Sequence, residues 1–268
     1  MTGAPAEERT EYRDSELRFW DGVASRYAHR ARPSLSTLSF SFAVDSDVAF
    51  LDALGEVRGM KILDVGCGFG DLSILLADMG AEVYGLDFTR SMVTVARARA
   101  CEFAPQVCFV VGDAQLTPFG PEEFDAVVAM RAVHHFPDIP GFLREVRRVL
   151  KPGGKAVFIE PQKANPIVEL NRRIFRPEQH SEHEHALTTK DIDAVRTIFP
   201  KNRTDVFYLV SPAAFVFDRV LKNRKLFEKS YKGLQRMEAA MRRLSMLNRF
   251  YWQVLIVTEK ECARDDSH

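Results

Sequence analysis

The stretch Lys61-Ile-Leu-Asp-Val-Gly-Cys-Gly-Phe-Gly-Asp71 decides the fold of this chain. The apolar run from Met60 to Val65 predicts a buried parallel strand. A helical pattern of apolar residues begins directly after the glycines, at Leu72, Ile74, Leu75 and Leu76. Glycine at a strand-to-helix turn lets the backbone approach a ligand closely, because no Cβ is in the way. The stretch therefore predicts a strand, a ligand-binding turn and a helix in succession.

A second expected strand, residues 82–87, ends in Asp87. A carboxylate at the tip of that strand can accept two hydrogen bonds from a ribose diol. The glycines Gly66, Gly68 and Gly70 are spaced G-x-G-x-G, one residue shorter than the dinucleotide fingerprint. The pair of features predicts a nucleoside-bearing cofactor, and the short loop counts against a nicotinamide dinucleotide.

Asp64-Val-Gly-Cys-Gly-Phe-Gly70 resembles motif I of the class I S-adenosylmethionine-dependent methyltransferases, D-x-G-x-G-x-G, without a mismatch. Four further segments resemble later motifs of that family, in the same order: Gly85–Met92, Val111–Ala114, Phe124–Arg131 and Leu150–Gly154. The resemblance covers residues 60–161 and is closest to the ubiquinone/menaquinone-type ("type 11") small-molecule methyltransferases. It implies an α/β, Rossmann-like, seven-stranded sheet, mostly parallel, with the last strand antiparallel between the fifth and sixth. Helices are expected on both faces, with a helical lid.

The resemblance also implies the cofactor, S-adenosylmethionine, and its product, S-adenosylhomocysteine. Asp87 is expected to bind the ribose, and the acidic turn at Asp113 to reach the adenine amino group. Cys67 is expected to be a small buried side chain rather than a nucleophile. The full set of expected cofactor contacts is Asp64, Gly66, Cys67, Gly68, Gly70, Asp87, Phe88, Met92, Asp113, Ala114, Met130 and Arg131.

We expect four segments: an N-terminal tail and lid helices (1–55), the cofactor-binding core (56–161), a lid insertion (162–187) and the C-terminal part of the core (188–268), with a helical insertion at 212–247. Residues 1 to about 10 are expected to be disordered. The expected strands are 60–66, 82–87, 107–112, 124–130, 155–161, 206–210 and 250–258. The expected helices include 17–27, a short helix capped by Asp45 or Ser46, 71–79, 90–102, 140–150, 167–175, one capped by Thr188 or Thr189, and two within 212–247. The lid segments are expected to cover the carboxyl edge of the sheet, where open α/β sheets bind ligands.

The amino-acid composition indicates which kinds of binding partner and cellular compartment to expect. The 268 residues carry 37 basic and 37 acidic side chains, without the basic excess of a nucleic-acid binder. The four cysteines form no C-x-x-C pair and no zinc spacing, as in a reducing compartment. We expect no secretory leader, because residues 1–14 are polar and charged, and the sequence contains no apolar run of about 20 residues. We therefore expect a cytoplasmic protein with a small-molecule acceptor, no nucleic-acid partner and no transmembrane segment. The oligomeric state stays open.

Two adjacent histidines follow the fourth expected strand, beside the expected sulfonium. Methyl transfer is an in-line displacement, and good orientation contributes roughly 7–11 kcal/mol to lowering its barrier. A hydroxyl or ammonium acceptor must also lose a proton, most often to a histidine. His134 and His135 are the candidate bases, with His135 preferred; the alternative for both is a packing role. In similar phosphoethanolamine-type enzymes such a histidine pairs with a lid tyrosine, which implies Tyr27 here, unless Tyr27 is a core aromatic.

A histidine-rich stretch, Gln179–His185, holds His180, His183 and His185. Its spacing matches no zinc motif, so we expect no metal. A solvated loop is one interpretation; the other is that His185 reaches into the acceptor pocket and takes part in catalysis.

Basic residues are concentrated in the expected lid. Arg172, Arg173 and Arg176 lie in one element, and residues 219–249 hold ten Lys or Arg against Glu228 and Glu238. A solvated helix face is one interpretation. An anionic acceptor, or docking at an acidic carrier or membrane surface, is the other.

The favoured function is methyl transfer from S-adenosylmethionine to a small-molecule acceptor in specialised metabolism (natural product biosynthesis), with hydroxyl before amine or carbon. The alternative is a non-methylating reaction, such as cyclisation, on the same cofactor-binding fold. A non-catalytic partner subunit is disfavoured by the intact glycine turn and Asp87.

Overall fold

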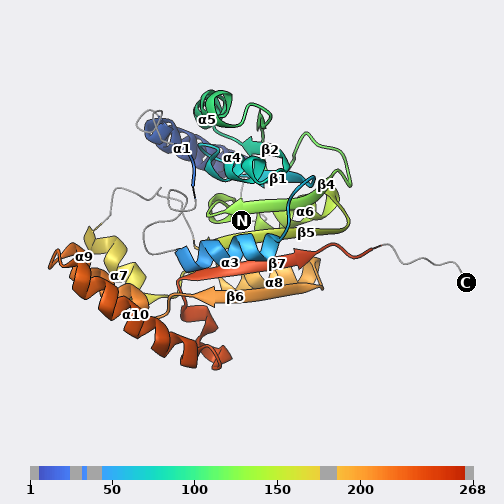
Figure 1. The fold of residues 1–268 in the computed structure, drawn as a ribbon. Coiled ribbons are helices and arrows are strands. Elements are labelled where there is room, and N and C mark those ends of the chain that lie inside the picture. The colour runs from blue at the N-terminus through green and yellow to red at the C-terminus, as the bar shows by residue number, and fades with distance from the viewer. Residues whose placement is uncertain (1–5, 25–31, 35–43, 176–185, 263–268) are drawn as a thin grey trace, which may run out of the picture.

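A single seven-stranded sheet organises the chain (Figure 1). The computed structural model describes residues 6–24, 32–34, 44–175 and 186–262. The strand order is β3-β2-β1-β4-β5-β7-β6, with β7 antiparallel to both of its neighbours and β1 to β5 parallel. The predicted fold class is confirmed. The strands are β1 Lys61–Val65, β2 Glu82–Asp87, β3 Cys108–Val111, β4 Phe124–Met130, β5 Leu150–Pro161, β6 Asn202–Phe207 and β7 Gln253–Glu259.

Helices cover both faces of the sheet because successive strand side chains point to opposite sides. In β4, Val127 packs in the apolar cluster that contains Phe142 of α6, whereas Val128 packs in the cluster that contains Phe50 of α3. The described helices are α1 Ala6–Ala24, α3 Val44–Leu54, α4 Asp71–Asp78, α5 Arg90–Phe103, α6 Ile139–Val149, α7 Pro166–Phe175, α8 Thr189–Ile198, α9 Phe215–Arg219 and α10 Arg224–Met241, with 3-10 turns η1 Val133–His135, η3 Ser211–Ala214 and η4 Ser245–Phe250. No described helix is long and apolar enough to cross a bilayer.

The N-terminal boundary differs from the expectation. Helix α1 begins at Ala6, so the expectation of disorder up to about residue 10 is wrong for residues 6–10. The run Ala6-Glu7-Glu8-Arg9 consists of good helix formers, with acidic side chains at the end where the helix dipole favours them. These residues extend a helix that packs on α5, where the Ser91 hydroxyl donates to Asp21. Helix α3 likewise begins at Val44, one or two residues before the expected cap.

Strand boundaries shift where the backbone leaves the extended region. Strand β6 spans Asn202–Phe207 rather than 206–210. It begins earlier because Asn202 already pairs with Thr258 of β7, and it ends earlier because Tyr208 has a left-handed φ of 68°. Strand β7 begins at Gln253 rather than at residue 250, because Ser245–Phe250 forms a 3-10 helix. Thr188 caps α8 in a capping box with Asp191, as expected.

The insertion between β6 and β7 folds as the two expected helices, α9 and α10. Phe227 of α10 stacks on Phe215 of α9. The buried carboxylate of Glu238 accepts hydrogen bonds from the backbone N–H groups of Val210 and Ser211, at 2.5 and 2.6 Å, and so ties α10 to the end of β6. Figure 1 shows α7, α9 and α10 together at one end of the sheet, with α1 at the same end above the other strands. The division of the chain into four segments stays a prediction.

Candidate cofactor-binding and active site

The glycine turn links β1 to α4 with three left-handed residues, Gly66, Gly68 and Gly70. A Cβ on Gly66 would overlap the side chain of Ala132, so packing as well as φ requires glycine there. A Cβ on Gly68 would meet nothing within 4 Å, although φ is 50°. The turn therefore leaves open space above Gly68, where a ligand can approach the backbone.

Asp87 closes β2 directly beside this turn and is 8% exposed. One carboxylate oxygen accepts from the Gly68 N–H at 3.0 Å and the other from the Thr89 N–H at 2.8 Å. Burial raises the pKa of Asp87, while these two backbone hydrogen bonds and nearby His135 act in the opposite direction. The carboxylate is held in one orientation, and each oxygen keeps acceptor capacity for a hydroxyl group.

Asp64 and Cys67 lie deeper under the turn. Asp64 is 2% exposed and accepts a 2.5 Å hydrogen bond from the Ser73 hydroxyl, which joins the end of β1 to α4. Burial raises the pKa of Asp64 to about 7, although the Ser73 hydrogen bond lowers it. Burial likewise raises the pKa of the Cys67 thiol well above its usual value, which disfavours the nucleophilic thiolate.

A cavity of about 460 Å³ lies over the turn, within the size range of small-molecule sites. Its wall contains nine of the predicted cofactor residues: Asp64, Gly66, Cys67, Gly68, Asp87, Phe88, Met92, Met130 and Arg131. Sequence reasoning did not single out six others: Phe69, Asp71, Leu72, Thr89, Ala132 and Phe136. Most of these residues are immediate neighbours of predicted residues in the sequence. Their position next to a predicted contact was the available indication that they line the cavity.

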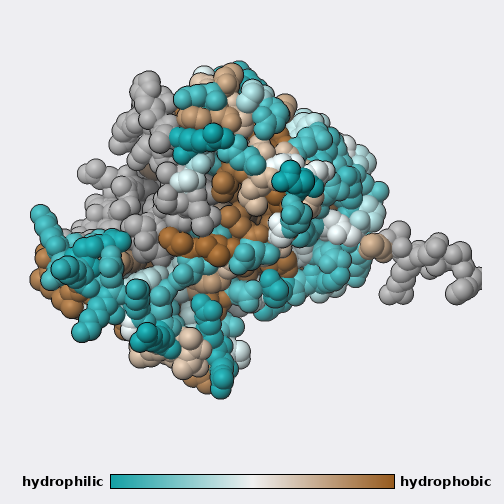
Figure 2. Space-filling model, in the orientation of Figure 1, coloured by the Kyte–Doolittle hydropathy of each residue, from teal (hydrophilic) through white to brown (hydrophobic). Residues whose placement is uncertain are grey.

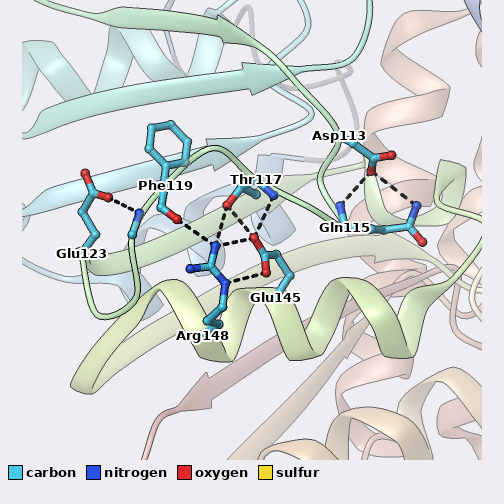
Figure 3. Close-up of polar contacts among 8 residues, drawn as sticks. Asp113, Gln115, Thr117, Phe119, Glu123, Glu145 and Arg148 are labelled. Atoms are coloured by element: carbon cyan, nitrogen blue, oxygen red, sulfur yellow. Dashed lines mark hydrogen bonds and ion pairs between the residues drawn. The ribbon is translucent and has the colours of Figure 1, made fainter.

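Three predicted cofactor residues lie outside that wall. Gly70 faces inward, where a Cβ would come 2.7 Å from the ring of Phe109. Ala114 is buried within the loop that follows β3. Asp113 begins that loop and accepts from the backbone N–H of Gln115 at 2.9 Å (Figure 3). For these three residues, cofactor contact stays a prediction.

A buried polar network holds the loop after β3 against α6 (Figure 3). The Glu145 carboxylate accepts from the backbone N–H and the hydroxyl of Thr117, at 2.8 and 2.7 Å. Arg148 bridges Glu145 and the Phe119 carbonyl. Burial opposes ionisation of Glu145, but the hydrogen bonds from Arg148 and Thr117 outweigh it, so the pKa of Glu145 is lowered. The network fixes the path of the chain near Asp113.

The structure separates the two candidate histidines. His134 is buried and absent from the cavity wall; its Nδ1 lies 2.6 Å from the fully buried Glu160 carboxylate. Glu160 also accepts from the backbone N–H groups of Ala132 and Val133, both at 2.9 Å. His135 is the one of the two that lines the cavity. His134 and Glu160 therefore set the turn that presents His135.

Helix α1 supplies the other side of the His135 environment. Glu16 is 1% exposed, and its Oε2 lies 3.2 Å from His135 Nδ1. Trp20 donates to the same oxygen at 3.1 Å, packs edge-on to the His135 ring at 5.2 Å and lines the cavity. Sequence reasoning missed Glu16; the available signal was its position one helical turn before Trp20. The predicted Tyr27 and His185 lie outside the described residues, as do His180, His183 and the side chains of Arg172, Arg173 and Arg176.

Arg131 stands at the end of β4 with a left-handed φ of 57°, a strained conformation that tends to occur at functional sites. Its guanidinium pairs with the fully buried Asp47 of α3, at 2.8 Å. Next to Asp47, the Ser46 hydroxyl donates to Gln253 at 2.6 Å. This network fixes α3 against the sheet and holds a cation in the cavity wall. Among the described residues, no cluster of three or more His, Cys, Asp or Glu forms a metal-binding group.

Comparisons with known proteins agree with this geometry. Residues 63–158 match the family described as "Methyltransferase domain". The chain is similar to a demethylmenaquinone methyltransferase of Lactococcus lactis, with 35% identity over 46% of this chain and 49% of that protein. It is also similar to a ubiquinone biosynthesis O-methyltransferase of Aliivibrio fischeri, with 40% identity over 40% of this chain and 47% of that protein. The chain thus spans about half the length of the curated relatives it matches.

A solved structure supports the fold. Phosphoethanolamine N-methyltransferase 2 of Haemonchus contortus, in complex with S-adenosylhomocysteine, superposes with a TM-score of 0.56 at 18% identity, over 82% of this chain and 53% of that one. The glycine turn, the acid at the tip of β2, the strand order and the matched family together identify the domain. Residues 63–158 match a methyltransferase domain, and the fold around them is that of the class I S-adenosylmethionine-dependent methyltransferases.

Proposed function

We propose that this protein transfers a methyl group from S-adenosylmethionine to a hydroxyl group of a small, ring-containing acceptor. The observation that carries the proposal is the single cavity that contains the open Gly68 turn, the ribose-binding candidate Asp87 and the histidine candidate His135. Two relatives, the demethylmenaquinone methyltransferase and the ubiquinone biosynthesis O-methyltransferase, are named for quinone compounds, which supports a quinol-type acceptor. Specialised metabolism remains the setting that we propose.

The residues present fit the cofactor. Asp87 has the spare acceptor capacity that a ribose diol needs, and Gly68 leaves room for the adjacent chain of the ligand. Met92 and Phe88 supply apolar surface for the adenine ring. When bound, S-adenosylmethionine supplies a methyl group on a positively charged sulfur and leaves as S-adenosylhomocysteine.

His135 accepts the acceptor's proton in this proposal. As the S–CH₃ bond breaks and the O–CH₃ bond forms, the hydroxyl proton passes to the imidazole. Glu16 Oε2 lies 3.2 Å from Nδ1 and so holds the imidazole ring in one orientation. Trp20 and Phe136 border the same space, where aromatic surface favours a planar apolar ring and excludes water.

The test begins with cofactor binding, measured by calorimetry with S-adenosylmethionine and S-adenosylhomocysteine. Transfer of a labelled methyl group to a catechol and to a 1,4-naphthohydroquinone then reports the activity. The proposal predicts micromolar or tighter cofactor binding and label in at least one of the two phenolic ethers. Cofactor binding without label in any hydroxyl, amine or carbon acceptor would instead favour a non-methylating reaction such as cyclisation. Absence of cofactor binding would contradict the proposal outright.

A further inference from the structure

One face of α10 carries positive charge in a regular pattern. We define the basic stripe as Lys225, Lys229, Lys232 and Arg236, which are spaced by four, three and four residues and are all exposed. At about 100° per residue these positions fall within a sector of roughly 60°. Figure 2 shows mainly hydrophilic side chains over the lobe that holds α9 and α10, at the lower left, with hydrophobic ones at its left edge.

The opposite face of α10 is anchored to the body of the protein. Phe227 is buried against Phe215, and Tyr231 and Leu234 pack in the same cluster. Glu238 is buried at the end of β6, where it accepts backbone hydrogen bonds. The helix therefore presents the basic stripe from a fixed support.

The acidic residues of this helix do not neutralise the stripe. Glu238 faces the interior, and Glu228 pairs with Arg224, at 3.0 Å. Among the described residues, no acidic side chain lies within ion-pair distance of a stripe residue. Like charges one helical turn apart repel each other, whereas a merely solvated face usually alternates the two signs. The pattern is costly for the helix and indicates an anionic partner.

Exposed aliphatic side chains flank both ends of α10. Val220 and Leu221 precede it, with 52% and 57% of their surface exposed, and Leu244 and Met246 follow it, with 52% and 74%. Nucleic acids offer phosphate but no surface that favours exposed aliphatic groups. The interface of an anionic bilayer accommodates both basic and aliphatic side chains, because the cations contact the headgroups while the apolar side chains enter the acyl boundary.

We propose that the basic stripe and the aliphatic residues at its ends form a docking surface for an anionic lipid membrane. The surface belongs to the segment that follows the carboxyl end of β6, at the same edge of the sheet as the cavity. The protein would bind the membrane peripherally, through attraction between the basic stripe and the anionic headgroups and through shallow insertion of the aliphatic side chains into the bilayer. The docking surface is separate from methyl transfer, and each can be tested without the other.

Vesicle flotation tests the docking surface. The intact protein is mixed with vesicles of phosphatidylcholine alone, or with vesicles in which phosphatidylglycerol replaces part of it. We expect binding to the anionic vesicles that is lost at about 1 M salt, where the Debye length falls to about 3 Å. Binding to neutral vesicles should be at least about 10-fold weaker, since each cation near an anionic surface contributes roughly 5-fold.

The variant K225Q/K229Q/K232Q/R236Q removes the stripe and should weaken binding to anionic vesicles by about 100-fold or more, at roughly 5-fold per cation. The matched control R58Q/R144Q/K190Q/R196Q removes four exposed cations on other elements and should retain most of the binding. All eight positions are exposed, so unfolding temperatures should remain close to that of the parent protein. Leu221→Ser with Leu244→Ser should weaken binding at high anionic content without altering its salt dependence.

Three results would overturn the proposal: no binding to anionic vesicles, equal binding to neutral vesicles, or equal loss in the control variant. If the parent protein ignores vesicles but binds heparin through the stripe, the partner is a soluble polyanion and the lipid proposal is wrong. Calorimetry with S-adenosylhomocysteine on the stripe variant separates the two proposals, since its affinity should be unchanged.

Discussion

The half of the molecule around β1, β2 and β4 differs in what determines its structure from the helices at one end of the sheet, α1, α7, α9 and α10 (Figure 1). In the first half, backbone geometry fixes each functional atom: left-handed glycines, strand ends and buried carboxylates that accept N–H groups. In the second, among the described residues, α1 contributes Trp20 to the cavity wall, and no residue of α7, α9 or α10 lines it. The first arrangement tolerates few sequences and suits a constant cofactor; the second can vary with the acceptor.

The largest expected effect concerns the two adjacent histidines. His134 contacts Glu160 of the sheet, whereas His135 contacts Glu16 and Trp20 of helix α1. His135→Ala should lower kcat for a hydroxyl acceptor by roughly 10²–10⁴-fold, the usual contribution of a general base. Cofactor affinity should change little, because the tested side chain faces the acceptor. Steady-state kinetics and calorimetry measure the two quantities.

His134→Gln is the control for that experiment. His134 is buried against Glu160 and does not reach the cavity, so this variant should affect stability more than kcat. Equal losses of kcat in the two variants would mean that the histidines act only by shaping the turn Val133–His135, and that neither histidine transfers a proton.

The glycine turn offers a comparison within the first half. Gly66→Ala should lower the free energy of unfolding by roughly 2–5 kcal/mol, since overpacking against Ala132 adds to left-handed strain. Gly68→Ala should cost only about 1–2 kcal/mol of stability, from strain alone. Its new Cβ enters the cavity, so cofactor affinity should fall. Denaturant titration and calorimetry distinguish the outcomes; a stability loss at Gly68 as large as that at Gly66 would contradict this division.

Asp64 predicts a pH dependence of stability. Its pKa is about 7 in the folded protein, against 3.8 for the unfolded reference, so the folded state binds more protons between those values. The stability contribution of protonated Asp64 is present below about pH 4 and is lost as pH rises through about 7. Relative to the parent, Asp64→Asn should therefore gain roughly 4 kcal/mol across that interval. Urea titrations of both proteins from pH 4 to pH 8 test this, and parallel stability curves would refute the assigned shift.

Asp87→Ala should weaken cofactor affinity by about 10-fold or more, since a buried hydrogen bond from a ribose hydroxyl to a charged group contributes roughly 1.5–3 kcal/mol. Asp113→Ala is the comparison, because Asp113 lies outside the cavity wall and should have the smaller effect. If calorimetry instead shows the larger loss of affinity for Asp113→Ala, the nucleoside binds nearer the loop after β3 than we propose.

The same division explains what the sequence could predict. The residues of the glycine turn follow from short-range patterns: an apolar run, glycines at fixed spacing and an acid at a strand tip. The place of the last strand was implied by the resemblance to the methyltransferase family. The partner of His135 does not, because Glu16 is more than 100 positions away, and its place one helical turn before Trp20 marks a shared helix face but not the contact with His135. The pairing of Arg131 with Asp47 was missed for the same reason, since it depends on how α3 docks. The strand ends at Phe207 and Gln253 depend on single backbone angles and a 3-10 turn that propensity alone does not resolve.

A crystal structure with S-adenosylhomocysteine tests the central claim most directly. We predict both ribose hydroxyls within hydrogen-bonding distance of the Asp87 carboxylate, the amino-acid chain over Gly68, and the sulfur directed toward the space bordered by His135 and Trp20. A nucleoside bound away from Asp87, or a sulfur that faces away from His135, would contradict the account.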